Sequence, residues 1–218
     1  MSSALVQKTA EYVKLKLHHE PSGHDWYHVR RVWQMSRLLQ KEEGGDLELV
    51  ELSALLHNLR EHGNTAFYEE KGSLALFGMM DVLGIEEELK QKILHVVEDG
   101  KYQGDDTKKP MTIEGMILQD ANWLDALGAV GIARAFASGG FIGRPIYDPD
   151  IKVRKRMNKQ LYQQKKKDTT SFNYLYEKAF RVAEILNTTT AKRIGATRIA
   201  FMKNFIEEFV KEWEEKDQ

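Results

Sequence analysis

Hydrophobic and polar positions recur with the helical period along most of the chain, and few stretches alternate as strands do. We therefore predict an all-α fold, with helices at 3–18, 25–43, 46–61, 66–83, 86–99, 112–137, 150–167, 171–187 and 189–215. The longest irregular stretch is "SGGFIGRPIYDPD" at 138–150. Its glycines and prolines predict an ordered loop that covers a site.

Length and composition favour one helical domain that spans residues 1–218, with two small lobes as the alternative. The formal charge is −1, so no global field indicates a nucleic-acid or membrane partner. The absence of cysteine excludes disulfides and thiolate metal sites. The amphipathic start and the absence of a long apolar stretch predict a cytoplasmic protein.

Polar side chains interrupt apolar helix faces at separate places in the sequence. In "GHDWYHVRRVW", His24, His28 and Arg31 recur at the spacing of one helix face. In "LVELSALLHNLREH", His57 and Asn58 interrupt a leucine-rich face. A lone buried histidine is usually just a satisfied core residue.

Asn122 and Asp125 interrupt a third apolar helix in "MILQDANWLDALGAVGIARAF". Three such interruptions favour a shared site over separate buried polar residues that are each satisfied locally. Divalent metals such as Mn²⁺, Ni²⁺ or Fe²⁺ accept imidazole together with carboxylate, and helices of a bundle can project such ligands to one centre. We therefore predict that these polar groups converge.

The motifs "DWYHVRRVW", "ALLHNL" and "QDANWLDALGAVGIARAF", in this order, resemble the HD superfamily of metal-dependent phosphohydrolases. The stretches "SGHDWYHVRRV", "LDALGAVGIARAFASGG" and "YEKAFRVAEILNTTTAKRI" resemble its bacterial branch that hydrolyses nucleotides, typified by nucleoside triphosphate pyrophosphohydrolases. The resemblance implies an HD-domain helical bundle with a central metal and phosphate pocket. It also implies a hydrolase that uses Mn, Ni, Fe or Mg and acts on a small phosphate compound, a nucleotide. The balanced charge and the lack of a long apolar stretch favour neither nucleic acid nor a membrane as a partner.

The metal ligands implied by the resemblance are His28, His57 and positions 58 and 122. Positions 58 and 122, where the family has aspartates, hold Asn58 and Asn122. Two amides supply none of the negative charge of two carboxylates, so we expect impaired metal binding. Asp125 lies one turn after Asn122 and is the candidate for a rescue ligand.

The resemblance also implies roles for other residues. Glu61 becomes the candidate general base, with surface pairing to an arginine as its alternative. His24 and Arg31 become phosphate contacts, with local capping or salt bridges as the alternative. Arg144 is a phosphate candidate because the glycines around it let the backbone approach a ligand. Tyr174 stands where the family commonly has a histidine.

The run "IKVRKRMNKQLYQQKKKD" is strongly basic, and we interpret it as the solvated face of a helix. Three functional hypotheses stay open. The protein is a metal-dependent phosphohydrolase that works despite its asparagines, or an inactive HD-fold protein that binds a phosphorylated ligand without turnover, or a normal enzyme in which asparagines were introduced to trap an inactive form. The substrate, the metal and the oligomeric state do not follow from the sequence.

Overall fold

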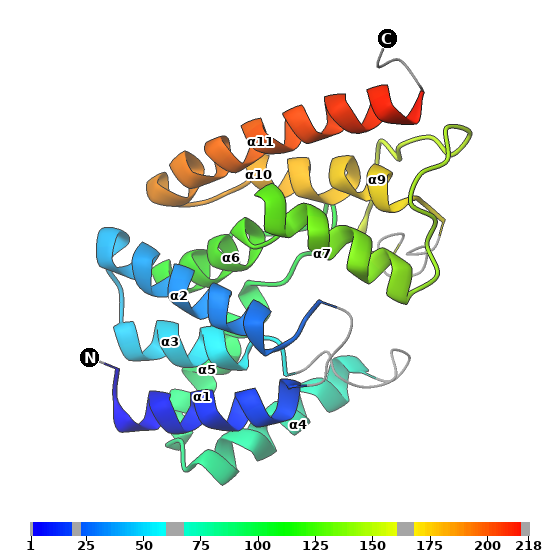
Figure 1. Ribbon diagram of the computed structural model, residues 1–218. Coiled ribbons are helices and arrows are strands. Elements are labelled where there is room, and N and C mark those ends of the chain that lie inside the picture. The colour runs from blue at the N-terminus through cyan, green and yellow to red at the C-terminus, as the bar shows by residue number, and fades with distance from the viewer. Residues whose placement is uncertain (1, 19–22, 60–67, 161–167, 215–218) are drawn as a thin grey trace. The chain divides into compact units, whose positions relative to one another are not determined.

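The computed structural model shows a helical protein (Figure 1). It describes residues 2–18, 23–59, 68–160 and 168–214. Within these ranges no strand occurs, so the predicted all-α class is confirmed. No helix in the described ranges is long and apolar enough to cross a membrane.

The chain divides into two compact units. The first unit contains residues 1–102 and 107–121, and the second contains residues 103–106 and 122–218. The boundary falls inside one helix, between Ala121 and Asn122. That the two units act as a single HD domain stays a prediction.

The described residues of the first unit form helices in the order α1 (Ala4–Leu17), α2 (Trp26–Glu43), α3 (Leu47–Leu56), α4 (Tyr68–Leu83), α5 (Glu87–Asp99) and the first part of α6 (Ile113–Leu124). Its central helix is α3, which contacts α1, α2 and α5 (Figure 1). Every residue of α3 from Leu49 to Leu56 is buried. A fully buried leucine stabilises the fold by about 1.5–3 kcal/mol, so α3 forms the core of this unit.

The end of α3 determines whether His57 and Asn58 lie within the helix or after it. We predicted a helix to residue 61, but α3 ends at Leu56, and His57 is its C-cap residue. The His57 amide donates to the Ser53 carbonyl at 2.9 Å, and the Leu59 amide donates back to Leu56 at 3.2 Å. His57 and Asn58 therefore lie in the turn that follows the helix, not within it.

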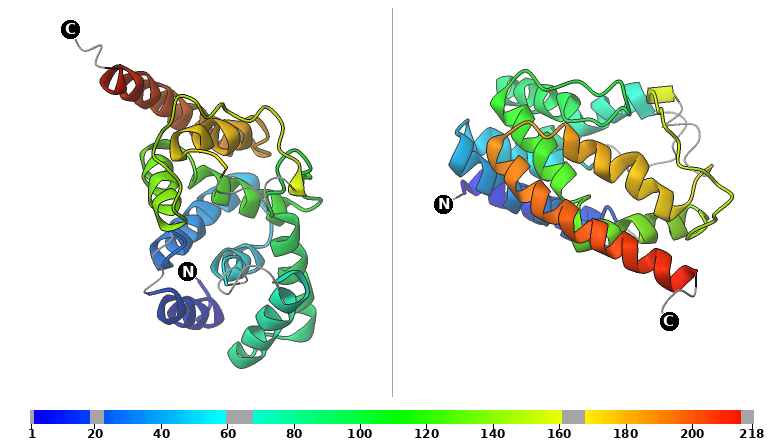
Figure 2. Two further views of the ribbon diagram at one scale, coloured as in Figure 1. Left: turned by 90° about the vertical axis from the view of Figure 1, so that its right-hand side faces the viewer. Right: turned by 90° about the horizontal axis from the view of Figure 1, so that it is seen from above.

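The second unit contains α7 (Gly128–Phe141), α9 (Ser171–Tyr174), the π-helix η1 (Leu175–Phe180), α10 (Arg181–Glu184) and α11 (Thr189–Trp213). The three short elements follow one another without a break and form one helical stretch, 171–184. The long helix α11 runs back alongside this stretch (Figure 2). Aromatic rings pack against Phe209 of α11, including Phe172 at 4.7 Å between ring centroids and Trp213 at 5.7 Å.

Two predicted boundaries around α7 are wrong. The single helix predicted at 112–137 is broken between α6 and α7, where Gly128 adopts a φ of 73°. A Cβ at Gly128 would meet the side chain of Arg198 at 3.2 Å, so glycine fits this corner. The loop predicted at 138–150 also begins later, because α7 continues through its glycines to Phe141. Glycine lowers helix propensity, but it does not prevent a helix that packs well.

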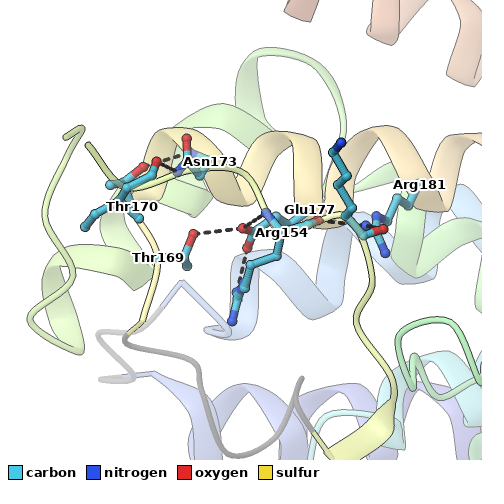
Figure 3. Close-up of polar contacts among 8 residues, drawn as sticks. Arg154, Thr169, Thr170, Asn173, Glu177 and Arg181 are labelled. Atoms are coloured by element: carbon cyan, nitrogen blue, oxygen red, sulfur yellow. Dashed lines mark hydrogen bonds and ion pairs between the residues drawn. The ribbon is translucent and has the colours of Figure 1, made fainter. Parts of the chain in front are cut away.

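The basic segment 151–158 is not the helix that we predicted at 150–167. It is irregular, and side chains of other elements bind its backbone (Figure 3). The Arg154 amide donates to Glu177 at 2.9 Å, and the Met157 amide donates to Asp105 at 2.6 Å. Arg181 donates to the Arg154 carbonyl at 2.9 Å. These bonds replace the backbone bonds that a helix would make.

Candidate functional site

Two histidines that are far apart in the sequence meet in the first unit. His28 lies in the first turn of α2, and His57 caps α3. Their Nε2 atoms are 3.3 Å apart, and the His28 side chain is buried. Asp25 caps α2 by accepting from the His28 amide at 2.9 Å, which fixes where this histidine leaves the helix. The predicted approach of these two side chains is therefore observed.

The hydrogen-bond partner of His57 sets its tautomer. Its Nδ1 atom lies 2.7 Å from the carbonyl oxygen of Ala54. A carbonyl oxygen only accepts, so Nδ1 carries the hydrogen, and in the neutral ring Nε2 keeps its lone pair. In a pair of neutral rings, the 3.3 Å Nε2 contact is a hydrogen bond when His28 carries its hydrogen on Nε2. A cation between the two rings would need both lone pairs, so its binding would displace that hydrogen.

Asn58 is buried near the histidines, and its side chain donates a hydrogen bond to the backbone. Its Nδ2 atom donates to the carbonyl oxygen of His24 at 2.6 Å, and its side chain is 2% exposed. The amide oxygen of Asn58 is therefore the atom that remains for a cation or a water. An aspartate at this position would have no hydrogen to give to His24.

The donor set fits a divalent cation only in part. Metal–nitrogen bonds of about 2.0–2.1 Å place neighbouring ligand atoms about 3.0–3.4 Å apart, which is the separation of the two Nε2 atoms. The Ala54 carbonyl supports His57 as backbone carbonyls support metal-binding histidines. Within the described parts of the chain, however, no three His, Asp or Glu side chains are grouped to hold a metal ion. His28 and His57 would hold a cation, and the amide of Asn58 would add a neutral third ligand.

The other predicted residues of the first unit lie near this pair or outside the described residues. The ring of His24 stands edge-on to that of His28, with centroids 5.6 Å apart. Arg31 follows His28 on α2 and is half-buried. Glu61, the candidate base, lies outside the described residues, so its role stays a prediction.

Asn122 and Asp125 belong to the second unit. Asn122 is half-buried on α6, and its approach to the histidines stays a prediction. Asp125 is buried, and its carboxylate binds Arg134 Nη1 at 3.0 Å. Burial lowers the pKa of the nearby Arg198, and the charge of Asp125 partly offsets this shift. Because Arg134 already holds the Asp125 carboxylate, a rescue role would require breaking that ion pair.

Arg144 and Tyr174 come together in the second unit. Arg144 is 7% exposed, and its guanidinium lies over the ring of Tyr174, 4.7 Å from the centroid. The Lys178 ammonium lies 5.7 Å from the centroid of the same ring. The sequence predicts Arg144 as a phosphate contact and Tyr174 only as a departure from the family pattern. Lys178 was missed, although its i,i+4 spacing from Tyr174 predicted that the two would meet.

Sequence reasoning also missed Arg134, Glu177 and the carbonyl of Ala54. A backbone carbonyl leaves no signal in the sequence. Glu177 looks like an ordinary helix residue next to a lysine, yet its side chain is fully buried. Arg134 could have been suspected, because a buried aspartate needs a cationic partner and α7 brings this arginine to it.

Comparisons with known proteins agree with this fold. A family model described as "HD domain" matches residues 25–127. The chain is 30% identical over 206 residues to YpgQ of Bacillus subtilis, an uncharacterized protein, covering 92% of this chain and 90% of that one. YpgQ has been crystallised in complex with ADP, and that structure matches with a TM-score of 0.72 and 28% identity over 95% of this chain and 97% of that one.

Two further crystal structures match over nearly the whole chain. A Lactobacillus plantarum protein matches with a TM-score of 0.87 and 32% identity, over 98% of each chain. An HD-superfamily hydrolase from Bacillus thuringiensis matches with a TM-score of 0.71 and 38% identity, over 98% of this chain and 97% of that one. Together with the paired histidines, these similarities show that the chain belongs to the HD-domain superfamily of hydrolases, in the YpgQ-like family.

Proposed function

We propose that this protein binds nucleotides and acts on them as a phosphohydrolase whose divalent-metal centre is weak. The observation that carries the proposal is the pairing of His57 and His28 through Nε2, with the His57 tautomer set by Ala54. This arrangement offers a cation two nitrogen ligands at a suitable spacing. The relative YpgQ was crystallised with ADP, which supports a nucleotide as the ligand.

The weakness of the proposed centre follows from charge. Asn58 and Asn122 stand where the family resemblance implies carboxylates, so a divalent cation would keep its charge in a partly buried site. Each 1.4 kcal/mol of lost attraction weakens binding by about tenfold. A bound cation would polarise a phosphoryl oxygen and lower the pKa of a bound water. His24 and Arg31 are proposed to contact phosphate oxygens, and Glu61 is proposed to take a proton from the attacking water.

A second candidate function is nucleotide binding without turnover. Asn58 favours it, because its amide hydrogen bond to the His24 carbonyl satisfies this part of the pocket with no cation present. Under this alternative, nucleotide binding would not change with added Mn²⁺, and phosphate release would be absent at every metal concentration.

The test restores the two charges. In the Asn58→Asp, Asn122→Asp double variant we expect Mn²⁺ to bind at least about tenfold more tightly than in the unsubstituted protein, as measured by calorimetry. We also expect the double variant to release phosphate or pyrophosphate from nucleotides at lower Mn²⁺ concentrations than the unsubstituted protein requires. Asn204→Asp, an exposed position on α11, is the matched control and should change neither value.

The single Asn58→Asp change also has a predicted cost without metal. A carboxylate oxygen would replace the Nδ2 donor opposite the His24 carbonyl, so we expect a loss of about 1–3 kcal/mol of stability. If the double variant binds Mn²⁺ no better than the unsubstituted protein, the proposed location of the metal centre is wrong.

A further inference from the structure

The exposed face of α11 carries its charges in two separate blocks. The first part of the helix, orange in Figure 1, has no acidic residue before Glu207. Its exposed charged side chains are Lys192, Arg193 and Lys203. The last part, red in Figure 1, exposes Glu207, Glu208, Lys211 and Glu212. One helix of the second unit therefore presents a positive end and a mainly negative end.

This order of charges does not stabilise α11 itself. The dipole of a helix favours acidic groups near its first turn and basic groups near its last turn. The first turn of α11 has no acidic residue. Within the described ranges, an ion pair of this face joins Glu208 to Lys211 at 3.2 Å, but none reaches Arg193 or Glu207. The separation of the two blocks is therefore better explained by a partner outside this helix.

The positions of the charges are complementary to those of a second, antiparallel copy. Arg193 and Glu207 each lie seven residues, about two helical turns, from Ala200, so all three residues lie on one side of α11. All three are exposed. When two copies of α11 meet antiparallel at Ala200, Arg193 of each copy lies beside Glu207 of the other. Such a contact has two-fold symmetry and closes on itself, so it gives a dimer and not a filament.

The centre of this face lets a second helix approach. Ala196 and Ala200 have short exposed side chains, and Phe201 beside them is 51% exposed, which adds apolar area. A strip about 30 Å long and one helix diameter wide buries a few hundred Å² on each copy. A stable complex buries about 800 Å² per partner. We therefore expect a reversible dimer with a dissociation constant on the order of 10–100 μM.

We propose that the exposed face of α11 binds a second copy of this chain, antiparallel and centred on Ala200. Arg193 of each copy forms an ion pair with Glu207 of the other. This interface lies within the second unit and does not depend on the proposed action on nucleotides.

The experiment is sedimentation equilibrium of the full-length protein at low ionic strength. Arg193→Glu and Glu207→Arg each replace two attractive contacts of the dimer by two repulsive ones. We expect each change to raise the dissociation constant by about tenfold or more. Lys155→Glu is the matched control, because it reverses a charge at an exposed position outside α11. It should leave the dissociation constant unchanged.

Combining the two reversals tests the antiparallel pairing directly. The double variant Arg193→Glu, Glu207→Arg exchanges the two charges, so each ion pair forms again and the dimer should return. An equimolar mixture of the two single variants should also form a mixed dimer. One variant is acidic at both positions and the other is basic at both, so their contacts are attractive only across the mixed pair.

A cross-link tests the centre of the interface. The chain has no cysteine, so Ala200→Cys introduces a single thiol at the two-fold axis. We expect mild oxidation to give a disulfide-linked dimer, because two facing small residues bring their Cα atoms within the roughly 4.4–6.8 Å that a disulfide spans. Lys155→Cys is the control and should stay monomeric on a denaturing gel.

Several results would overturn the proposal. A protein that stays monomeric up to about 1 mM would leave this face to a different partner. A dimer that neither reversal weakens would form through another surface. Equal weakening by Lys155→Glu would indicate diffuse attraction between charges. Weakening by both reversals without recovery in the double variant or the mixture would exclude the antiparallel arrangement.

Discussion

Removing the Glu177 carboxylate should destabilise the second unit strongly. The carboxylate is fully buried and accepts from the Arg154 amide at 2.9 Å, the Arg154 guanidinium at 2.5 Å and the Thr169 hydroxyl at 3.1 Å. In Glu177→Ala these donors lose this acceptor. Breaking a fully buried ion pair costs about 3–5 kcal/mol, but the Arg154 side chain is 22% exposed, so water recovers part of this. We expect a loss of about 3 kcal/mol.

The substitution Glu177→Gln separates charge from hydrogen bonding. The amide keeps one oxygen that accepts a hydrogen bond but loses the charge that binds the guanidinium, so we expect a smaller loss of about 1–2 kcal/mol. Glu208→Ala is the control. Glu208 pairs with Lys211 at 3.2 Å on the exposed face of α11, and removing that pair should cost less than about 0.5 kcal/mol.

Urea unfolding followed by circular dichroism measures the change in stability. Hydrogen exchange measures it locally, because the Arg154 amide donates directly to Glu177 and should exchange faster in Glu177→Ala. The reasoning is refuted if Glu177→Ala loses no more stability than Glu208→Ala, or if the Arg154 amide keeps its protection.

Three further predictions concern packing and backbone conformation, and urea unfolding checks each of them. Leu52→Ala removes a fully buried side chain from α3 and should cost about 2–5 kcal/mol. Gly104→Ala should cost more than about 2 kcal/mol, because Gly104 has a φ of 64° and a Cβ there would overlap the Met157 carbonyl. Gly78→Ala should instead stabilise by about 0.5–1 kcal/mol, since Gly78 lies inside α4 with open space around its Cα.

The helical class and the histidine pair were predictable because each leaves a pattern in the sequence. Amphipathic periodicity marks the helices, and histidines on apolar faces indicate an enclosed site. The end of α3 was harder to predict, because "LVELSALLHNLREH" continues the helical pattern and contains no glycine or proline. The chain leaves the helix at His57, whose ring binds the backbone of the last turn. Such a cap depends on one side-chain rotamer, which the sequence does not reveal.

The basic segment was mispredicted for a different reason. A run of lysines and arginines has good helix propensity, and propensity describes only local preference. In the folded protein, Glu177 and Asp105 bind backbone amides of this segment from distant positions in the sequence. Tertiary hydrogen bonds of this kind override the local helix propensity. They cannot be predicted from the residues of the segment itself.

The hydrogen bond from His57 to Ala54 couples the chemistry of the site to the hydrophobic core. The carbonyl that holds the imidazole belongs to the last turn of α3, whose residues are all buried. The other tautomer would set the Nδ1 lone pair against this carbonyl oxygen, so the folded turn favours the hydrogen on Nδ1. The position of the last turn of α3 therefore sets which nitrogen of His57 carries the hydrogen. Substitutions in the core of α3, far from any ligand, should appear in the nitrogen chemical shifts of His57 before they appear in the fold.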